Sequence, residues 1–331
     1  MDRLCAIRSA YGKGLAGLGR KNGNVVVLDA DVSNSTRSIE FKNEFPDRFF
    51  NFGIAEANMV SAAAGLAAMG KIPFVNTFSF LLCERALDQI RSNVAYNNLN
   101  VKFAANYGGL SDSFDGPSHH TISDLAIIRS IPNMAMVVIS DAVCMEKALE
   151  PITEWNGPVY FRLCRAETPV VHDDSYRFEL GKGVLLRDGT DLTIITTGIL
   201  LHRVLKAAEM LKNEGIKARV IEIHTIKPID RDIILKAAKE TGAILVCEEA
   251  NVIGGLGSAV SDVTSRECPV FLDFVGINDC YAESGEYESL LDKYGMSTDE
   301  MVTKAKSLMS KKYAEVGEYE SLLDRYGITA D

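Results

Sequence analysis

The chain has 331 residues, of which 47% are hydrophobic and 24% are charged, and its formal net charge at neutral pH is −10. This length suits about two domains, each with its own core. The acidic balance argues against nucleic acid or a membrane surface as a partner, because both are recognised by clustered positive charge. The 7 cysteines are scattered, which predicts reduced thiols in a cytoplasmic protein.

The first half of the chain predicts an alternation of helices and buried strands. Residues 2–20 carry apolar side chains at a helical spacing. Continuous apolar runs followed by a polar turn and a helix are typical of a parallel α/β sheet. We expect strands at 25–28, 49–52, 72–75, 101–105 and 134–139, and helices at 55–69 and 85–96.

A polar stretch over 165–177 contains Pro169 and lacks periodicity, which predicts a linker before a second α/β pattern. We expect strands at 192–197, 218–223 and 243–247, and helices at 200–214, 230–240 and from 254 onward. The fold class is therefore α/β, with two tandem, doubly wound parallel-sheet domains. The expected divisions are a domain at 1–166, a linker at 167–180, a domain at 181–312 and a tail at 313–331.

The tail contains a short duplication. The segment 285–295 returns as 317–327, and only Lys293 and Arg325 differ between the two copies. Two copies are too few for a repeat architecture. We therefore expect no catalytic role for this segment.

Glu56 opens an otherwise apolar helix, and it has two interpretations. A glutamate in the first turn commonly offsets the helix dipole, and the spacing alone favours this interpretation. A buried glutamate could instead act as a proton relay. The pair Phe78 and Phe80 follows an expected strand, and such aromatic residues are more often core than a cofactor platform.

The loop 107–120 concentrates glycines, acids and the adjacent His119 and His120 after a strand end, where open α/β sheets bind ligands. No third ligand has suitable spacing, so we predict no metal site on this chain. An acid/base or hydroxyl-binding loop remains open. Arg8 and Arg165 could bind an anion, although surface ion pairs are the more common use of such arginines.

Taken together, the motifs resemble the C-terminal part of the transketolase family along the chain to about residue 312. The stretches that carry this resemblance are VVVLDADVSNST, FPDRFFNFGIAEANM, TFSF…RALDQIRSNVAY, DGPSHH, RSIPNM, HTIKPID and EEANVIGGLGSAV. They cover a pyrimidine-binding domain and a C-terminal domain. Their length and order resemble the second subunit of a split, two-chain transketolase.

The resemblance implies a thiamine diphosphate site shared between domains. Glu56 matches the residue that hydrogen-bonds the aminopyrimidine ring and promotes loss of the thiazolium proton. Phe78 matches the aromatic residue that stacks on that ring, Leu81 takes the place of a second pocket aromatic, and Asp31 matches an acid near the thiazolium. A buried carboxylate can hold and share such a proton.

The same resemblance implies the substrate residues. Asp115 and His119 match groups that bind sugar hydroxyls, with His119 also catalytic. Arg8 and Arg165 match arginines that bind the distal phosphate of a sugar phosphate, with Ser33 or Ser35 assisting. Tyr107 stands where a histidine is usual, and Phe114 replaces the glutamate of a G-E-D-G run. These two departures leave the sugars undetermined and make a sulfonated or branched ketose a reasonable expectation.

The family's G-D-G…N motif, which binds the diphosphate and Mg²⁺, has only the near match Arg187-Asp-Gly189 in this chain. An N-terminal partner subunit is therefore expected to supply these ligands, in an α2β2 heterotetramer. The expected activity is ketol transfer from a phosphorylated or otherwise anionic ketose, such as a sulfosugar, to an aldose. The alternatives are the β-subunit of a 2-oxo-acid dehydrogenase and a non-catalytic regulatory subunit; the DGPSHH loop and the two arginines favour the transferase.

Overall fold

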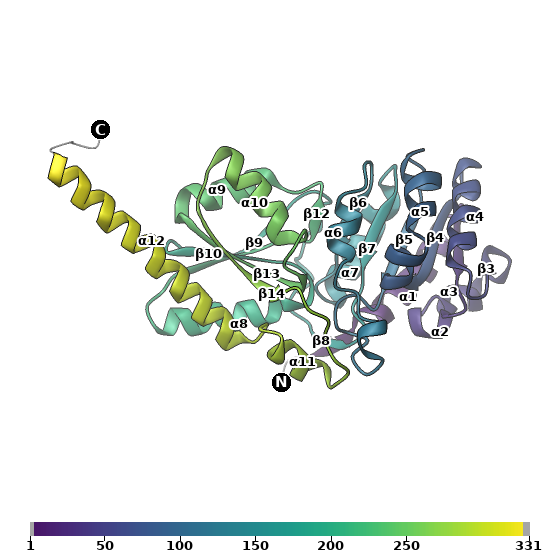
Figure 1. Ribbon diagram of the computed structural model, residues 1–331. Coiled ribbons are helices and arrows are strands. Elements are labelled where there is room, and N and C mark those ends of the chain that lie inside the picture. Colours follow the sequence, from purple (N-terminus) through teal and green to yellow (C-terminus); the bar gives the residue numbers. More distant parts are fainter. Residues whose placement is uncertain (1–2, 327–331) are drawn as a thin grey trace.

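The computed structural model describes residues 3–326, and it shows two α/β units side by side, with the N-terminal half of the chain in one and the C-terminal half in the other (Figure 1). Both central sheets are mostly parallel. The predicted fold class of two tandem α/β domains is thus confirmed. Within the described residues, no helix is long and apolar enough to cross a membrane.

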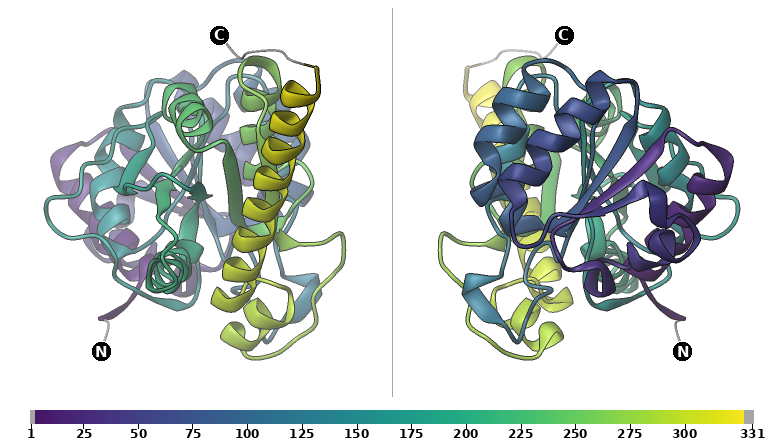
Figure 2. Two further views of the ribbon diagram at one scale, coloured as in Figure 1. Left: turned by 90° about the vertical axis from the view of Figure 1, so that its left-hand side faces the viewer. Right: turned by 90° about the vertical axis from the view of Figure 1, so that its right-hand side faces the viewer.

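The first sheet has seven strands in the order β12-β6-β7-β5-β4-β2-β3, parallel except for β12. Its strands are β2 (Val25–Asp29), β3 (Phe49–Asn51), β4 (Ile72–Phe78), β5 (Lys102–Asn106), β6 (Ala135–Val138), β7 (Val159–Arg162) and β12 (Thr225–Lys227). Helices cover both faces (Figure 2). They are α1 (Ile7–Lys21), α3 (Ile39–Glu44) and α7 (Ala142–Glu154) on one face, and α4 (Glu56–Ala68) and α6 (Asp124–Arg129) on the other.

The second sheet has five strands in the order β14-β13-β10-β11-β9. Its strands are β9 (Val184–Arg187), β10 (Leu192–Thr196), β11 (Ala218–Glu222), β13 (Ala243–Asn251) and β14 (Phe271–Ile277). Helices α8 (Leu201–Asn213) and α12 (Thr298–Tyr326) pack on one face, and α9 (Arg231–Thr241) and α10 (Leu256–Glu267) on the other. The central strands β10 and β11 are buried along their whole length, as expected for strands covered on both faces.

The expected helix over 85–96 is instead an irregular segment. It consists of a π-helix (Leu81–Arg85), a short α5 (Leu87–Gln89) and a second π-helix (Ile90–Ala95). The amide of Ala86 bonds the carbonyl of Leu81, and Tyr96 bonds Arg91, each five residues back. π-Helical turns are rare in proteins overall, and those that occur often lie near functional sites.

The N-terminal helix begins later than expected, because β1 (Leu4–Ala6) precedes it. β1 pairs antiparallel with β8 (Glu167–Pro169), which lies in the stretch expected to be an irregular linker. The short strands β1, β8, β9 and β12 escaped prediction because three or four residues carry too little periodicity, and β14 was also missed. The exact domain boundaries remain predictions.

The two copies of the duplicated segment differ in structure. The first forms the short helix α11 (Tyr287–Lys293), which ends before Gly295 with its positive φ of 79°. The backbone of the second copy, as far as Tyr326, continues α12 without interruption. Side chains from residue 315 and the backbone from residue 327 lie outside the described part, so the expected lack of a catalytic role stays a prediction.

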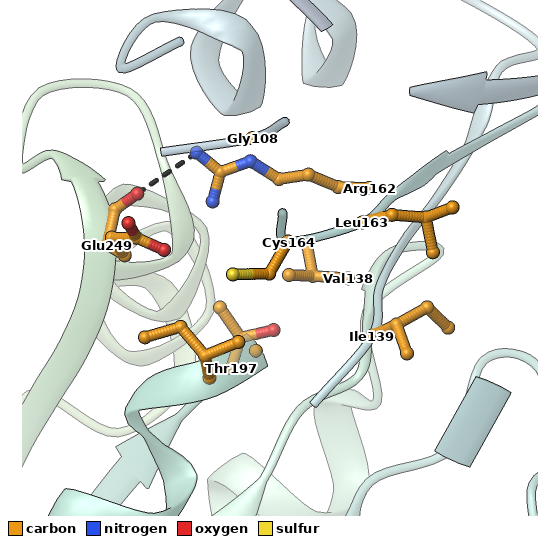
Figure 3. Close-up of a pocket in the computed structure, with 10 residues that line it drawn as sticks. Gly108, Val138, Ile139, Arg162, Leu163, Cys164, Thr197 and Glu249 are labelled. Carbon is orange, nitrogen blue, oxygen red and sulfur yellow. Dashed lines mark hydrogen bonds between the residues drawn. The ribbon is translucent and has the colours of Figure 1, made fainter. Parts of the chain in front are cut away.

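The side chain of Arg162 joins the two domains (Figure 3). It lies at the end of β7, is 4% exposed, and forms an ion pair with Asp124 at 2.9 Å. Its Nη2 donates to the carbonyls of Thr121, at 2.7 Å, and of Glu249 in the C-terminal domain, at 3.0 Å. This buried cation therefore fixes the end of the loop 107–120 relative to the second sheet.

Candidate active site

Polar residues gather at the carboxyl ends of the central strands of the first sheet. Asp29 ends β2, Phe78 ends β4, and Asn106 ends β5 just before the glycine-rich loop. Asp29 is buried and accepts hydrogen bonds from the Val32 amide and from the Ser38 hydroxyl, both at 2.7 Å. Because ligands bind at this edge of open α/β sheets, the topology brings the sequence candidates to the expected place.

Glu56 is the first residue of α4, and its side chain is only 1% exposed. Its Oε2 forms an ion pair with Arg85 Nη1 at 3.2 Å, whereas Oε1 is buried and has no hydrogen-bond partner among the residues that the structure describes. A charge that served only the helix dipole would remain in water. An unpartnered buried carboxylate oxygen costs folding free energy and is typical of an atom that binds a ligand.

An aromatic cluster lies beside the glycine-rich loop. Phe78 stacks on Tyr107 with ring centroids 4.5 Å apart, and Phe80 contacts His119 with centroids 5.0 Å apart. Leu81 follows and is buried at the start of the first π-helix. Phe78 remains half-buried, so part of its ring is free to contact a further group.

Tyr107 adopts a positive φ of 64°, which turns the chain from β5 into the loop. Its hydroxyl accepts a hydrogen bond from Arg8 Nη1 at 3.1 Å, and the guanidinium carbons of Arg8 and Arg165 lie 5.9 and 5.2 Å from its ring centroid. Arg8 Nη1 also donates to the backbone carbonyl of Ser35 at 3.1 Å. Ser33 lies nearby in sequence as the first residue of α2 (Ser33–Thr36).

Asp112, Asp115 and His119 approach one another in the same loop, with their oxygen and nitrogen atoms within 4.8 Å. His119 Nδ1 lies 3.0 Å from the hydroxyl of Ser118, and Asp112 forms an ion pair with Arg165 at 2.7 Å. Burial raises the pKa of Asp112 to about 6, while Arg165 opposes the rise and Asp115 adds to it. This proximity supplies the third group that spacing did not reveal. The expectation of no metal on this chain nevertheless remains a prediction.

The C-terminal domain holds this loop in shape through Glu249. Glu249 Oε1 accepts hydrogen bonds from the Leu110 amide at 2.8 Å and from the Tyr287 hydroxyl at 2.9 Å. Gly109 has a φ of 67°, and a Cβ there would lie 2.2 Å from the Glu249 carboxyl carbon. Burial raises the pKa of Glu249 to about 7.

Asp31 lies at the exposed rim of the site. It has a positive φ of 66° and accepts a hydrogen bond from Asn51 Nδ2 at 2.8 Å. Ile54 and Phe114, which lie close in sequence to Glu56 and Asp115, are exposed at 75% and 70%.

Comparison with known proteins identifies this arrangement. The model of the transketolase pyrimidine-binding domain matches residues 4–170, and the model of the transketolase C-terminal domain matches residues 181–301. The chain belongs to the transketolase family. It is 43% identical to a Methanocaldococcus jannaschii protein named as a putative transketolase C-terminal section, over 92% of this chain and 97% of that protein.

Two further relatives agree in length with this transketolase-family chain. A 6-deoxy-6-sulfo-D-fructose transketolase subunit of Clostridium sp. (strain MSTE9) is 39% identical over 92% of this chain and 95% of that subunit. A solved structure described as a split gene transketolase, inactive beta4 tetramer, is 44% identical, with a TM-score of 0.84, and covers 92% of this chain and 98% of its own.

The family implies thiamine diphosphate, and the residues present fit its aminopyrimidine half. Glu56 offers a buried acceptor oxygen, and Phe78, at the end of β4, offers a partly buried aromatic ring. An aminopyrimidine whose ring nitrogen carries a proton can donate an N–H to this oxygen, and its flat face can stack on an aromatic ring.

Sequence reasoning missed three residues that contact the candidate site residues or their loop. Arg85 pairs with Glu56, Asp112 pairs with Arg165, and Glu249 supports the loop. These pairs are separated by 29, 53 and 139 residues, so no local pattern connects them. The sequence shows adjacent acids at 248 and 249, but only the fold shows that Glu249 contacts the loop 107–120.

Proposed function

We propose that this chain is the C-terminal subunit of a thiamine diphosphate-dependent transketolase, which transfers a two-carbon ketol unit from an anionic ketose, a sugar phosphate or sulfosugar, to an aldose. The observation that carries the proposal is the buried, unpartnered Oε1 of Glu56. It lies at the same sheet edge as a loop rich in hydroxyl-binding groups. The split relatives support the division of the site between two chains.

Thiamine diphosphate, when bound, supplies the electron sink that allows the carbon–carbon bond of the ketose to break. Glu56 holds a proton at the pyrimidine ring, where its burial excludes water from that hydrogen bond. Phe78 and Leu81 would hold the pyrimidine ring by packing, and Asp31 would supply a negative charge for the thiazolium. The catalytic proton relay of this chain is thus Glu56 on the cofactor side and His119 on the sugar side.

Asp115 and His119 bind the hydroxyl groups of the sugar near its reacting carbons. His119 is partly buried against Phe80, so its ring is oriented while one edge stays available. Tyr107 contacts both arginines, through its hydroxyl to Arg8 and through its ring to Arg165. Arg8 and Arg165, assisted by Ser33 or Ser35, bind the distal end of the substrate, because guanidinium groups match the geometry of oxyanions.

A partner N-terminal subunit supplies the diphosphate and Mg²⁺ ligands, and the assembly is an α2β2 heterotetramer in the cytoplasm. The exposed Ile54 and Phe114 suit such an interface, since apolar side chains at the centre of an interface contribute much of its affinity. A β-subunit of a 2-oxo-acid dehydrogenase is disfavoured because its substrates lack the polyol chain that Asp115, His119 and the arginines suit. A purely regulatory subunit would not need an unpartnered Glu56.

Calorimetric titration of thiamine diphosphate with Mg²⁺ tests this proposal. We expect no measurable binding to the chain alone and tight binding to its mixture with the N-terminal partner subunit. The same mixture is then assayed for ketol transfer from a ketose to an aldose. Tight binding to the lone chain would contradict the shared site, and binding without transfer would contradict the transketolase activity.

A further inference from the structure

Asp112 is a buried acid in the middle of the candidate substrate loop. Its side chain is 1% exposed, and Oδ1 accepts a hydrogen bond from Arg165 Nη1 at 2.7 Å. Oδ2 is buried and has no hydrogen-bond partner in the described part of the chain, while the carboxyl group lies close to Asp115 and His119. Asp112 therefore lies between the hydroxyl-binding pair and the arginine at the distal end of the site.

The distal end of the site contains two arginines but also this carboxylate. Arg8 has no acidic partner among the side chains that the structure describes, and it bonds only neutral oxygens, those of Tyr107 and Ser35. Arg165, in contrast, is engaged by Asp112. A bound anion would therefore contact the Arg8 guanidinium, which has no acidic partner, and the Arg165 guanidinium, which is already paired with Asp112.

Charge balance then distinguishes between substrates. A phosphate dianion would lie near the Asp112 carboxylate and would compete with it for Arg165. A sulfonate carries one negative charge, and a hydroxyl group carries none and can donate a hydrogen bond to Oδ2. A repulsive group built against the wrong ligand is a common source of specificity. Burial raises the pKa of Asp112 to about 6, which leaves the carboxyl mostly ionised at neutral pH.

We infer that Asp112 is a specificity-determining residue, which lowers the positive charge of the distal subsite and selects ketoses whose far end carries at most one negative charge. The inference rests on the proposed ketol transfer and narrows its substrate class. The buried Oδ2 gives Asp112 a second role as acceptor for a substrate hydroxyl. A neutral Tyr107 hydroxyl beside Arg8 is consistent with the same selectivity.

The test measures kcat/KM of the complex with its N-terminal partner for three donors that differ only at C6: fructose, 6-deoxy-6-sulfofructose and fructose 6-phosphate. The wild-type complex should prefer the first two over the phosphate. Asp112→Asn removes the charge at nearly constant shape and should raise the phosphate-to-sulfonate ratio roughly tenfold, mainly through KM, because Arg165 becomes free for a bidentate contact. Asp112→Ala should change the ratio in the same direction, which guards against a local effect of the amide.

Two controls isolate the cause. The double variant D112N/R165M should lose the gain toward the phosphate, since the gain requires the released guanidinium. Asp262→Asn removes an acid that also pairs with an arginine, Arg129 at 2.8 Å, but on the exposed surface of α10. This variant should leave the donor ratio unchanged.

The outcomes separate the two proposals. An unchanged ratio in both D112N and D112A, with melting temperatures close to wild type, would overturn the role of Asp112 while leaving ketol transfer intact. A wild-type preference for the phosphate over both other donors would do the same. Binding of thiamine diphosphate without transfer from any of the three donors would overturn the proposed function, and the inference with it.

Discussion

Two glutamates at the carboxyl edges of the two sheets are equally buried but differently bonded. Glu56 in the N-terminal domain and Glu248 in the C-terminal domain are each 1% exposed. Both oxygens of Glu248 accept backbone N–H groups, from Leu256 at 2.7 Å and from Gly257 at 2.8 Å. Glu56 keeps Oε1 unpartnered. Burial alone therefore does not distinguish these two acids, whereas their hydrogen bonding does.

The sharpest test of this contrast is Glu56→Gln. We expect turnover of the reconstituted complex to fall by about 10²- to 10⁴-fold, the usual range for loss of a positioned proton-transfer group. The melting temperature of the chain should change little, because Oε1 makes no hydrogen bond in the fold. Steady-state rates and thermal unfolding measure both effects. Unchanged turnover would contradict the role assigned to Glu56.

Gly109→Ala should have the next largest effect. A Cβ at this position would strike the Glu249 carboxylate, and the φ of 67° disfavours any residue with a side chain. We expect a loss of roughly 3 kcal/mol of stability from backbone strain and overpacking. Denaturant unfolding measures this loss. Gly53→Ala is a matched control with the same φ of 67° but open space around it, so it should be milder.

Glu248→Gln tests the structural side of the comparison. The amide nitrogen of glutamine cannot accept a backbone N–H, so one of the two hydrogen bonds at the start of α10 is lost. The expected cost is about 1–3 kcal/mol in the free energy of unfolding, with near-normal turnover below the melting temperature. If the variant stayed folded but lost activity, Glu248 would belong to the active site, and the proposed difference between Glu56 and Glu248 would be wrong.

The pH dependence of stability gives a smaller effect. Burial raises the pKa of Glu249 to about 7 from its ordinary value of 4.5, so between these values the folded chain holds a proton that the unfolded chain releases. Its contribution is fully present below pH 4.5 and is lost as the pH rises through about 7. Glu249→Gln should therefore flatten the fall in unfolding free energy over this range by at most about 1.4 kcal/mol per pH unit. Identical slopes for wild type and variant would contradict this assignment.

The mildest effect is expected for the exposed apolar residue Ile54, which lies two positions before Glu56. Ile54→Ser shortens this side chain and should weaken binding of the partner subunit about fivefold to tenfold, through lost apolar burial of about 1–1.5 kcal/mol. Titration calorimetry of the two subunits measures the affinity. Leu185→Ser, at an exposed position on the far β9, should leave the affinity unchanged.

Much of the fold could be predicted from the strands that are buried on both faces. A short, continuous apolar run between polar turns, such as 25–28, is typical of such a parallel strand. The elements that escaped prediction depend on distant partners. β1 exists because β8 pairs with it, and β12 because β6 pairs with it. The site shows the same division. Glu56, Phe78 and His119 were predicted as site residues from motifs and stay predictions, whereas the pairing of Asp112 with Arg165 appears only when segments far apart in sequence come together.

The strand β12 has a consequence for how the protein can be divided. It belongs to the chain of the C-terminal domain but completes the sheet of the N-terminal domain, where it covers the edge of β6. A fragment that stops before residue 181 would leave this edge open as a template for aggregation. A chimera that takes its C-terminal domain from a relative should therefore retain residues 225–227 that fit the N-terminal sheet. The recombination unit is thus the pair of domains rather than either one alone.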